Sequence, residues 1–277
     1  MRLPTIKPPA VVPAHELDGE VYHRLPGASK SLLDAVARSP AHCAYAMSDH
    51  DKPQTPAMLL GSATHCMVLE PAAFTSRYVE KPPRLSAKAR AEYVEQGLTP
   101  ISSEQLAAAY AMSGAVLNHP IAGVLFEDIQ PEVSGFWIDS ETGVTCRIRM
   151  DAVSAGHHAI IDLKTAADAS ADGFARACAN FRYHVAAAMY LEGAAQLANA
   201  ALMQPVAHYI FVVVETTAPF AVASYTLDDD AMSIGYKLFR RDLATFAACD
   251  ASNQWPAYPP EVRPLSLPAW ARIIKES

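Results

Sequence analysis

Two carboxylates and one amine in the middle of the chain have the types and spacing needed for metal-assisted chemistry on a phosphodiester. Asp162, Leu163 and Lys164 form an Asp-Leu-Lys triplet, and Asp151 precedes it on a separate short segment. Hard divalent cations such as Mg²⁺ bind carboxylate, carbonyl and water oxygens. A cation held there lowers the pKa of bound water and screens phosphate charge, while an ammonium stabilises developing negative charge. The pattern predicts a metal-dependent nuclease.

A predicted hairpin brings Asp151 and Asp162 together. Residues 144–151 alternate between apolar and polar side chains, as a half-buried strand requires. Residues 159–164 form a second short apolar strand. If the loop between them is the four residues 155–158, the two aspartates become direct cross-strand neighbours on one face, within reach of a shared cation. A register shift of one residue would separate them.

The alternation of side chains along the second strand also predicts where Leu163 and Lys164 point. Lys164 lies on the face of Asp162, where its amine can assist the nucleophile. Leu163 points into the core and leaves its backbone carbonyl as an additional oxygen ligand. The alternative interpretation is a surface hairpin with a salt-bridged Asp and Lys, because an isolated Asp-x-Lys triplet occurs in many unrelated proteins.

The surrounding sequence favours the nuclease. The stretches TCRIRMDAV, IIDLKTAAD and ANFRYHVAAAMYLEGA include or follow the acids, and YHRLPGASKSLLDAVARSPAHCAYA, LLGSATHCMVLEP and WPAYPP lie in order around them. Together they resemble the nuclease core of RecE-type exonucleases (exonuclease VIII) in the PD-(D/E)xK superfamily, from about Tyr22 to Tyr258. The resemblance implies an α/β fold with a PD-(D/E)xK restriction-endonuclease-like core, a central mixed sheet flanked by helices, and N-terminal helical additions.

The resemblance also implies roles for individual residues. The implied catalytic set is His65, Glu132, Asp151, Asp162, Lys164 and Tyr183, and the implied metal ligands are His65, Glu132, Asp151, Asp162 and the Leu163 carbonyl. The implied cofactor is Mg²⁺, with Mn²⁺ as an accepted substitute. Without the resemblance, His65 would be interpreted as a packed core histidine. Glu132 would be one acid among 29.

One position departs from the pattern of that family. A glutamine follows the Tyr-His-Val segment in the family, whereas this chain has Ala186. A glutamine amide there would orient the lysine, a water or the substrate, and alanine cannot do so. We therefore expect weaker activity than a glutamine would give, with no structural penalty, because alanine suits a helix.

The formal net charge of −7 does not exclude a nucleic-acid partner. Net charge is a long-range average, and metal sites themselves require acids. Four arginines close in sequence to the site are the predicted DNA-binding residues: Arg147, Arg149, Arg176 and Arg182. A second basic stretch runs from Arg77 to Arg90. Such groups contribute salt-dependent affinity for phosphates without reading bases, although the stretch is equally typical of a solvated helix face.

The resemblance further implies the reaction and its partners. It implies a processive exodeoxyribonuclease that acts on ends of double-stranded DNA in the 5′→3′ direction and leaves 3′ overhangs for recombination. The implied assembly is a homo-oligomeric ring, a tetramer, through which DNA threads. The implied functional partner is a single-strand annealing protein of the RecT type.

Two other functions remain open at this point. A catalytically impaired or non-catalytic DNA-binding protein on the same fold is one, and Ala186 favours it. A metal-dependent hydrolase of a small phosphorylated metabolite is the other, and the lack of a glycine-rich phosphate loop argues against it. Metal titration separates the first from a nuclease, because only a nuclease would release nucleotides when loaded.

Composition sets the outer limits. The chain has 277 residues, of which 51% are hydrophobic, enough for one elaborated domain. We expect a proline-rich irregular arm over residues 1–20 and a single exonuclease domain over residues 21–277. No apolar run reaches the roughly 18 residues of a membrane span and no secretory leader is evident, so we expect a cytoplasmic protein. Five scattered cysteines argue against a metal cluster and for buried thiols.

Helical and strand periodicities place the remaining elements. We expect helices at about residues 29–40, 41–47, 58–69, 86–97, 102–118, 174–179, 182–200 and 228–249. We expect further strands at 132–138, 208–215 and 221–227. Ser102 and Gln105 have the spacing of a capping box.

Overall fold

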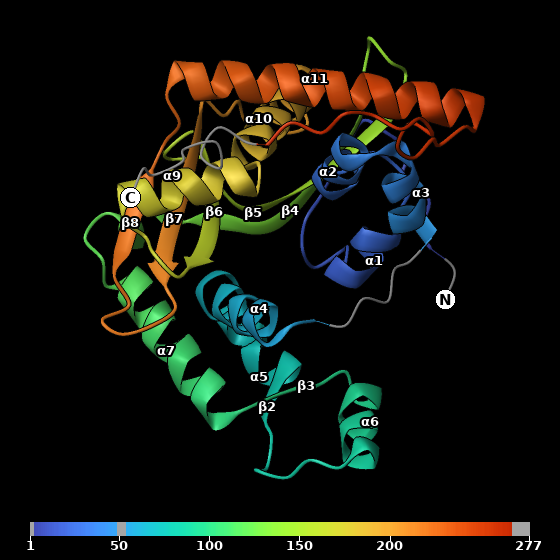
Figure 1. The fold of residues 1–277 in the computed structure, drawn as a ribbon. Helices are drawn as coiled ribbons and strands as arrows, with labels where there is room; N and C mark the ends of the chain where they lie inside the picture. Colours follow the sequence, from blue (N-terminus) through green and yellow to red (C-terminus); the bar gives the residue numbers. More distant parts are fainter. Residues whose placement is uncertain (1–2, 49–53, 268–277) are drawn as a thin grey trace, which may run out of the picture.

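The computed structural model describes residues 3–48 and 54–267. Its centre is a six-stranded mixed sheet in the order β1-β4-β5-β6-β7-β8 (Figure 1). The strands are β1 (Ala10–Val12), β4 (Ile129–Ile138), β5 (Thr145–Ser154), β6 (Ala159–Ala166), β7 (His208–Glu215) and β8 (Val222–Tyr225). β6 and β7 run parallel, and the other neighbouring pairs of this sheet are antiparallel. The expected α/β fold with a central mixed sheet is confirmed.

Helices cover both faces of this sheet. The helices of the described residues are α1 (Gly19–Arg24), α2 (Lys30–Arg38), α3 (Pro40–Ser48), α4 (Pro56–Leu69), α5 (Phe74–Arg77), α6 (Ala87–Glu95), α7 (Ser103–Leu117), α8 (Ala122–Leu125), α9 (Ala171–Asn180), α10 (Tyr183–Asn199) and α11 (Asp229–Ser252), with a 3₁₀ turn at Pro71–Ala73. In Figure 1, α9, α10 and α11 lie above the sheet, and α4 and α7 lie below it. Each side has its own buried apolar cluster.

Two glycines allow the close helix contacts on the upper side. A Cβ added at Gly193 of α10 would lie 2.6 Å from the ring of Trp137 on β4. A Cβ added at Gly235 of α11 would lie 2.2 Å from the carbonyl oxygen of His184. These distances are too short for any side chain, so the two glycines let α10 lie directly on β4 and α11 directly on the start of α10. That start carries Tyr183.

A smaller lobe extends from the lower side (Figure 1). It contains β2 (Tyr78–Glu80) and β3 (Thr99–Ile101), which form a two-stranded parallel sheet, together with α5 and α6. α7 follows β3 and begins with the predicted capping box, in which the side chains of Ser102 and Gln105 each accept from the other's backbone N–H.

The structure differs from expectation at the N-terminus. Part of the arm expected to be irregular, Ala10–Val12, forms β1 and pairs antiparallel with β4. The three residues give no readable alternation, and their pairing depends on a strand more than 100 residues away in sequence. Helix α2 begins where predicted, but the Ser29 side chain makes no capping hydrogen bond. Within the described residues, no helix is long and apolar enough to span a membrane.

Candidate metal and nuclease site

Three acids stand in one row across β4, β5 and β6. The register of β4 against β5, given by the pairs on either side, places Glu132 opposite Asp151. The register of β5 against β6 ends with Ala152 opposite Ile161, and the next residues along are Asp151 and Asp162. The predicted four-residue loop and its register are therefore confirmed. A row of acids results, one from each of three adjacent strands.

Strand geometry is interrupted at this row. Met150 packs in the cluster beneath α10, whereas Ala152, two residues further along β5, packs in the cluster on the α7 side. On the facing strand Glu132 has a φ of 52°, a conformation that costs a non-glycine residue about 1 to 3 kcal/mol. The predicted alternation thus holds up to Met150 and fails at Asp151. The distorted backbone coincides with the acids that need a special orientation.

His65, Glu132 and Asp151 form a group with metal-ligand geometry. Their ligand atoms all lie within 4.8 Å of one another, and His65 Nδ1 is 3.6 Å from Asp151 Oδ2. His65 comes from α4, which packs against β6, so one helix and two strands of the sheet supply this group. The backbone N–H of Leu163 donates to Asp151 Oδ2 at 3.0 Å and holds that carboxylate in place.

The electrostatics of this group favour a cation. Burial and then the Asp162 charge raise the pKa of Asp151 to about 7. Burial and then the Asp151 charge raise the pKa of Glu132. Burial and then the Lys164 charge lower the pKa of His65, which keeps the imidazole neutral and able to ligate. Crowded carboxylates beside a neutral imidazole fit a divalent metal, because the ion would supply the missing positive charge.

Asp162 and Lys164 form an ion pair beside that group. Burial opposes the charge on Lys164, but Asp162 and Asp151 outweigh it and raise the pKa of the amine. The Lys164 Nζ also lies 5.2 Å from the ring centroid of Tyr183, at the start of α10. Asp162 is thus next to the three grouped ligands and is engaged with the lysine. Its role as a metal ligand stays a prediction.

Leu163 is placed as expected. Its side chain is fully buried on the α7 side of the sheet. A hydrogen bond between its backbone and the His65 ring acts to raise the histidine pKa, against the larger effect of burial. The Leu163 backbone therefore contacts two residues of the site, Asp151 through its N–H and His65 through the second hydrogen bond.

Two of the four predicted DNA-binding arginines are held by partners within the protein and turned away from solvent. Arg147 is buried and donates to the backbone carbonyls of Tyr22, His23 and Gly27. It fixes the segment around α1 to β5. Arg182 caps α10 from a left-handed conformation, and its guanidinium pairs with acids on α2 and α11. Neither side chain is turned toward solvent.

The other two arginines differ in their access to a ligand. Arg149 Nε donates to Glu132 Oε2 at 2.6 Å, and Nη1 donates to the Leu17 carbonyl and the Ser134 hydroxyl, both at 3.0 Å. It also borders the cavity described below. Arg176 is 71% exposed at its side chain, with one long contact of 3.8 Å to Asp168. Among the four, Arg176 is the arginine most open to a phosphate.

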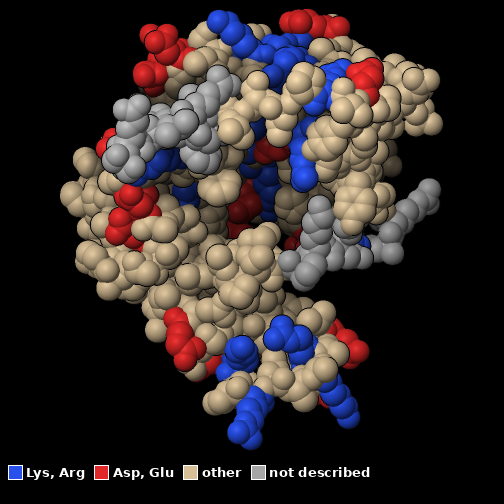
Figure 2. All heavy atoms as spheres, in the orientation of Figure 1, with Lys and Arg blue, Asp and Glu red and all other residues tan. Residues whose placement is uncertain are grey.

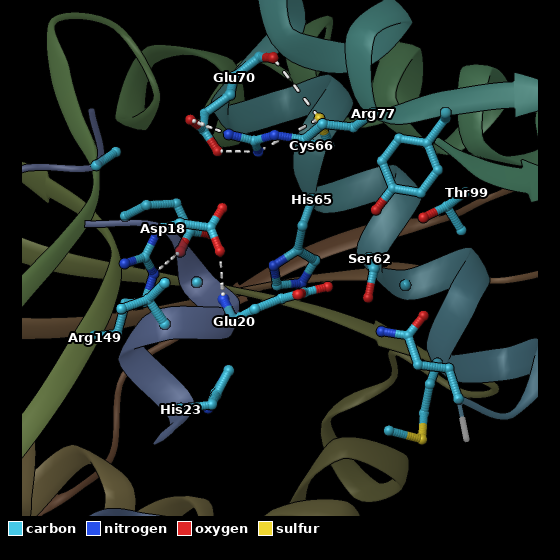
Figure 3. Close-up of a pocket in the computed structure, with 18 of the residues that line it drawn as sticks. Asp18, Glu20, His23, Ser62, His65, Cys66, Glu70, Arg77, Thr99 and Arg149 are labelled. Carbon is cyan, nitrogen blue, oxygen red and sulfur yellow. Dashed lines mark hydrogen bonds and ion pairs between the residues drawn. The ribbon is translucent and has the colours of Figure 1, made fainter. Parts of the chain in front are cut away.

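A cavity of about 930 Å³ opens beside the metal-ligand group. His65, Glu132 and Arg149 border it from the main sheet and α4, and α1 and the small lobe supply the other walls. Figure 3 shows His65 and Arg149 around one space, with Arg77 and Glu70 paired above it. Figure 2 shows the hollow between the larger body and the small lobe, with charged groups deep inside it. Lys and Arg side chains project from the far end of the lobe.

Sequence reasoning missed the wall contributed by α1. Asp18 accepts from the Glu20 backbone N–H at 2.8 Å and so caps this helix, and both residues line the cavity. An aspartate before a short polar segment is a capping signal. Six residues are too few for a readable helical period, so the signal alone does not reveal the element.

Ala186 lies one helical turn beyond Tyr183 on α10. Tyr190 follows after a further turn, and burial, with Asp151 and Asp162 acting in the same direction, raises its pKa well above the ordinary value. Residues three and four apart share one face of a helix, so Ala186 lies between two tyrosines that face the acids. A longer polar side chain at this position would point toward the site.

Comparisons with known proteins place the chain in a family and agree with its fold. A family model described as a PDDEXK-like domain of unknown function (DUF3799) matches residues 29–263. The chain is also similar to the crystal structure of a "Putative exonuclease" from Eubacterium rectale, with a TM-score of 0.57 and 12% sequence identity. That similarity covers 90% of this chain and 96% of the other. No curated protein matches.

Proposed function

Since the chain belongs to this family of PDDEXK-like domains, we propose that it is a metal-dependent nuclease that hydrolyses DNA phosphodiester bonds. The PD-(D/E)xK fold expected from the sequence is confirmed by the family match and the structural similarity. Neither comparison separates RecE-type enzymes from other members of the superfamily. The finer assignment rests on the motifs quoted above.

The observation that carries the proposal is the arrangement of acids and amine. Glu132, Asp151 and Asp162 stand in one row on three strands, with His65 beside Asp151 and Lys164 paired with Asp162. A surface hairpin with a simple salt bridge, the alternative considered from the sequence, would leave these groups solvated. Here they are largely buried and crowded, and two of them, His65 and Glu132, border a cavity large enough to admit a nucleotide.

The donor set suits Mg²⁺, or Mn²⁺ in its place, because most of the donors are oxygens. The residues that would hold the metal are His65, Glu132, Asp151, Asp162 and the Leu163 carbonyl. When bound, the metal supplies a water of lowered pKa and positive charge for the phosphate. Arg149 keeps Glu132 oriented through its 2.6 Å hydrogen bond, while the Leu163 N–H keeps Asp151 oriented.

Lys164 is the group that acts on the reacting phosphate. Its raised pKa keeps the amine protonated at neutral pH, so it donates hydrogen bonds to the attacking oxygen or to the phosphate as negative charge develops. Asp162 and the Tyr183 ring restrict where the ammonium can lie. His65, held neutral by burial, is available as a ligand and not as a proton donor.

We further propose that the enzyme is a 5′→3′ exodeoxyribonuclease that degrades one strand of duplex DNA and leaves a 3′ overhang. The RecE-type motifs support this polarity, and the description of the similar structure supports cleavage at ends. A homo-oligomeric ring would explain processive digestion, because enclosure of the DNA prevents dissociation without tight local contacts. A RecT-type annealing protein would use the exposed strand.

A duplex labelled separately at each 5′ and 3′ end tests activity and polarity together. With Mg²⁺ present, we expect early release of the 5′ label as short products and late release of the 3′ label. Glu95→Ala, an exposed acid on α6 far from the row, is the matched control and should digest like the unmodified protein. Early release of the 3′ label would overturn the polarity, and no release with Mg²⁺ or Mn²⁺ would overturn the nuclease.

The second candidate function is a non-catalytic DNA-binding protein on the same fold. Ala186, which replaces the expected glutamine, is the observation that favours it. The two candidates differ in one result, because both should bind Mn²⁺ at the acids and only the nuclease should then release nucleotides.

A further inference from the structure

An exposed aromatic ring stacks on Tyr183, the ring that lies beside Lys164. Phe181 ends α9 and directly precedes the Arg182-Tyr183 start of α10, and it is 60% exposed. A large apolar side chain with so much of its area in water is disfavoured unless something covers it in use. Its position beside the site suggests that substrate is what covers it.

Phe181 is the outer member of a row of nearly parallel rings. Phe181 stacks on Tyr183 with centroids 5.6 Å apart and an angle of 27°, and Tyr183 stacks on Phe174 at 5.9 Å and 27°. Phe174 in turn stacks on Tyr225 at 5.3 Å and 13°. The Tyr225 hydroxyl donates to the Ala169 carbonyl at 2.7 Å and anchors the inner end. The row is fixed inside the protein and ends at a ring that is open to solvent.

The backbone of Phe181 is held at both polar groups. Its N–H donates to the Ala177 carbonyl at 2.9 Å. Its carbonyl accepts from Lys30 Nζ at 2.6 Å, and this lysine also pairs with Asp34 on α2. The next residue, Arg182, pairs with Asp34 as well. The exposed ring therefore stands on an anchored backbone, which lowers the entropy lost when another ring stacks on it.

The row also passes the catalytic amine. Tyr183, the second ring, lies 5.2 Å from Lys164 Nζ. A planar group that continues the row on the outer face of Phe181 would therefore be separated from Lys164 by little more than two side chains. A nucleobase is the planar group that a nuclease substrate offers, and base-on-aromatic stacking is tolerant of sequence because every base has a π-face.

We propose that Phe181 is a stacking platform for a nucleobase of the strand being cleaved, adjacent to the scissile phosphate held at Lys164. This inference rests on the proposed nuclease function and adds a substrate contact to it. The base that stacks must be unpaired, because both faces of a paired base inside a duplex are already covered. The platform thus favours a frayed or separated strand end and requires no particular base.

Two substitutions separate the effect of a flat aromatic ring from the effect of an apolar side chain. Phe181→Leu keeps an apolar side chain and removes the ring, and Phe181→Trp keeps a flat ring. Ile121→Ala, which removes an exposed apolar side chain next to α8, serves as the distant control. The readout is the fluorescence of 2-aminopurine, placed at successive positions from the 5′ end of a single strand, because this base is quenched when it stacks. All proteins in this measurement also carry Asp162→Asn, so that the strand stays intact.

We expect quenching at one or two adjacent positions with the parent and with Phe181→Trp, and none with Phe181→Leu. Loss of one stacked base should weaken single-strand binding about 10-fold. In the cleavage-competent protein, Phe181→Leu should raise KM for a duplex whose end is frayed or single-stranded, because that end offers the unpaired base. The Ile121→Ala protein should match the parent in all three measurements.

Some outcomes would refute the proposed stacking role of Phe181 without refuting the proposed nuclease function. Equal quenching and equal KM for Phe181→Leu and the parent, in a protein that digests DNA, would do so. A change of oligomeric state in Phe181→Leu by light scattering, with unchanged quenching, would show that the ring contacts another subunit instead. If the parent neither binds nor digests DNA, the proposed function fails, and the platform fails with it.

Discussion

Replacing Asp151 by Asn should stabilise the metal-free protein at neutral and alkaline pH. Asp151 is buried beside Asp162, and its pKa is raised from 3.8 to about 7. In the unfolded chain the same carboxyl is ionised above about pH 4. The folded, metal-free protein therefore carries a charge above pH 7 that burial and a neighbouring carboxylate both disfavour. An asparagine has no charge and keeps an oxygen that accepts from the Leu163 N–H.

The sign and size of the effect follow from linkage between protonation and folding. Below about pH 4 the carboxyl is protonated in both states, so it makes no difference to the free energy of unfolding. As pH rises from about 4 to 7, the folded state retains a proton that the unfolded state has lost, and stability falls. A shift of roughly 3 units corresponds to about 4 kcal/mol. We expect about 2 to 4 kcal/mol, because Asp162 shares the titration.

Urea unfolding in EDTA at pH 4.5 and pH 8 measures this difference. The gap in free energy of unfolding between the Asp151→Asn protein and its parent should be about 1 kcal/mol at the lower pH and should be larger at the higher one. Added Mg²⁺ at pH 8 should stabilise the parent and have much less effect on the Asp151→Asn protein, because binding to the folded state raises stability. Glu95→Gln, at an exposed site, is the control. A gap between the two proteins that does not grow with pH would refute the electrostatic argument.

Four further substitutions separate the roles of individual residues. Asp162→Ala should abolish nucleotide release and leave the circular dichroism spectrum unchanged, because it removes a proposed metal ligand and relieves the crowding of carboxylates in the metal-free protein; retained hydrolysis would contradict the assignment. Ala186→Gln should raise the turnover number at saturating Mg²⁺, and an unchanged or lower value would show that the position does not reach the site. Arg147→Met should lower the free energy of unfolding by about 2 to 4 kcal/mol in urea titrations, because one buried and two partly buried carbonyls lose their donor. Arg176→Ala should leave stability unchanged and reduce the slope of log K against log salt by about one in a DNA-binding assay; an equal slope would exclude a phosphate contact.

The local elements of the fold could largely be predicted from sequence. The helix of residues 102–118 was marked by its capping box, and the helix between Ser86 and Gly97 by its bracketing residues; both are present. The strand 208–215 is observed with the expected limits. These features depend on neighbours in sequence, through capping, turn formation and apolar periodicity. β1, α1 and the small lobe's strands were missed, since three- to six-residue segments carry too little pattern.

The candidate site was predictable in part for the same reason. The loop length fixed the register that sets Asp151 opposite Asp162. Nothing local indicated that alternation would break at Asp151 or that Glu132 would adopt a left-handed backbone. The charge partners of the arginines were also unpredictable, because Arg147 and Arg182 meet groups more than 100 residues away in sequence.

The sequence by itself determined which chemistry is available, namely oxygen donors and one amine at a spacing that a hairpin can align. Tertiary structure decided which of these groups are buried together, which are already paired, and which aromatic ring remains open beside them. Burial and long-range pairing depend on how distant segments pack, and the same Arg or Asp carries no local mark of its eventual partner. The exposed ring of Phe181 and the enclosed guanidinium of Arg147 became distinguishable only after the sheet and its helices were assembled.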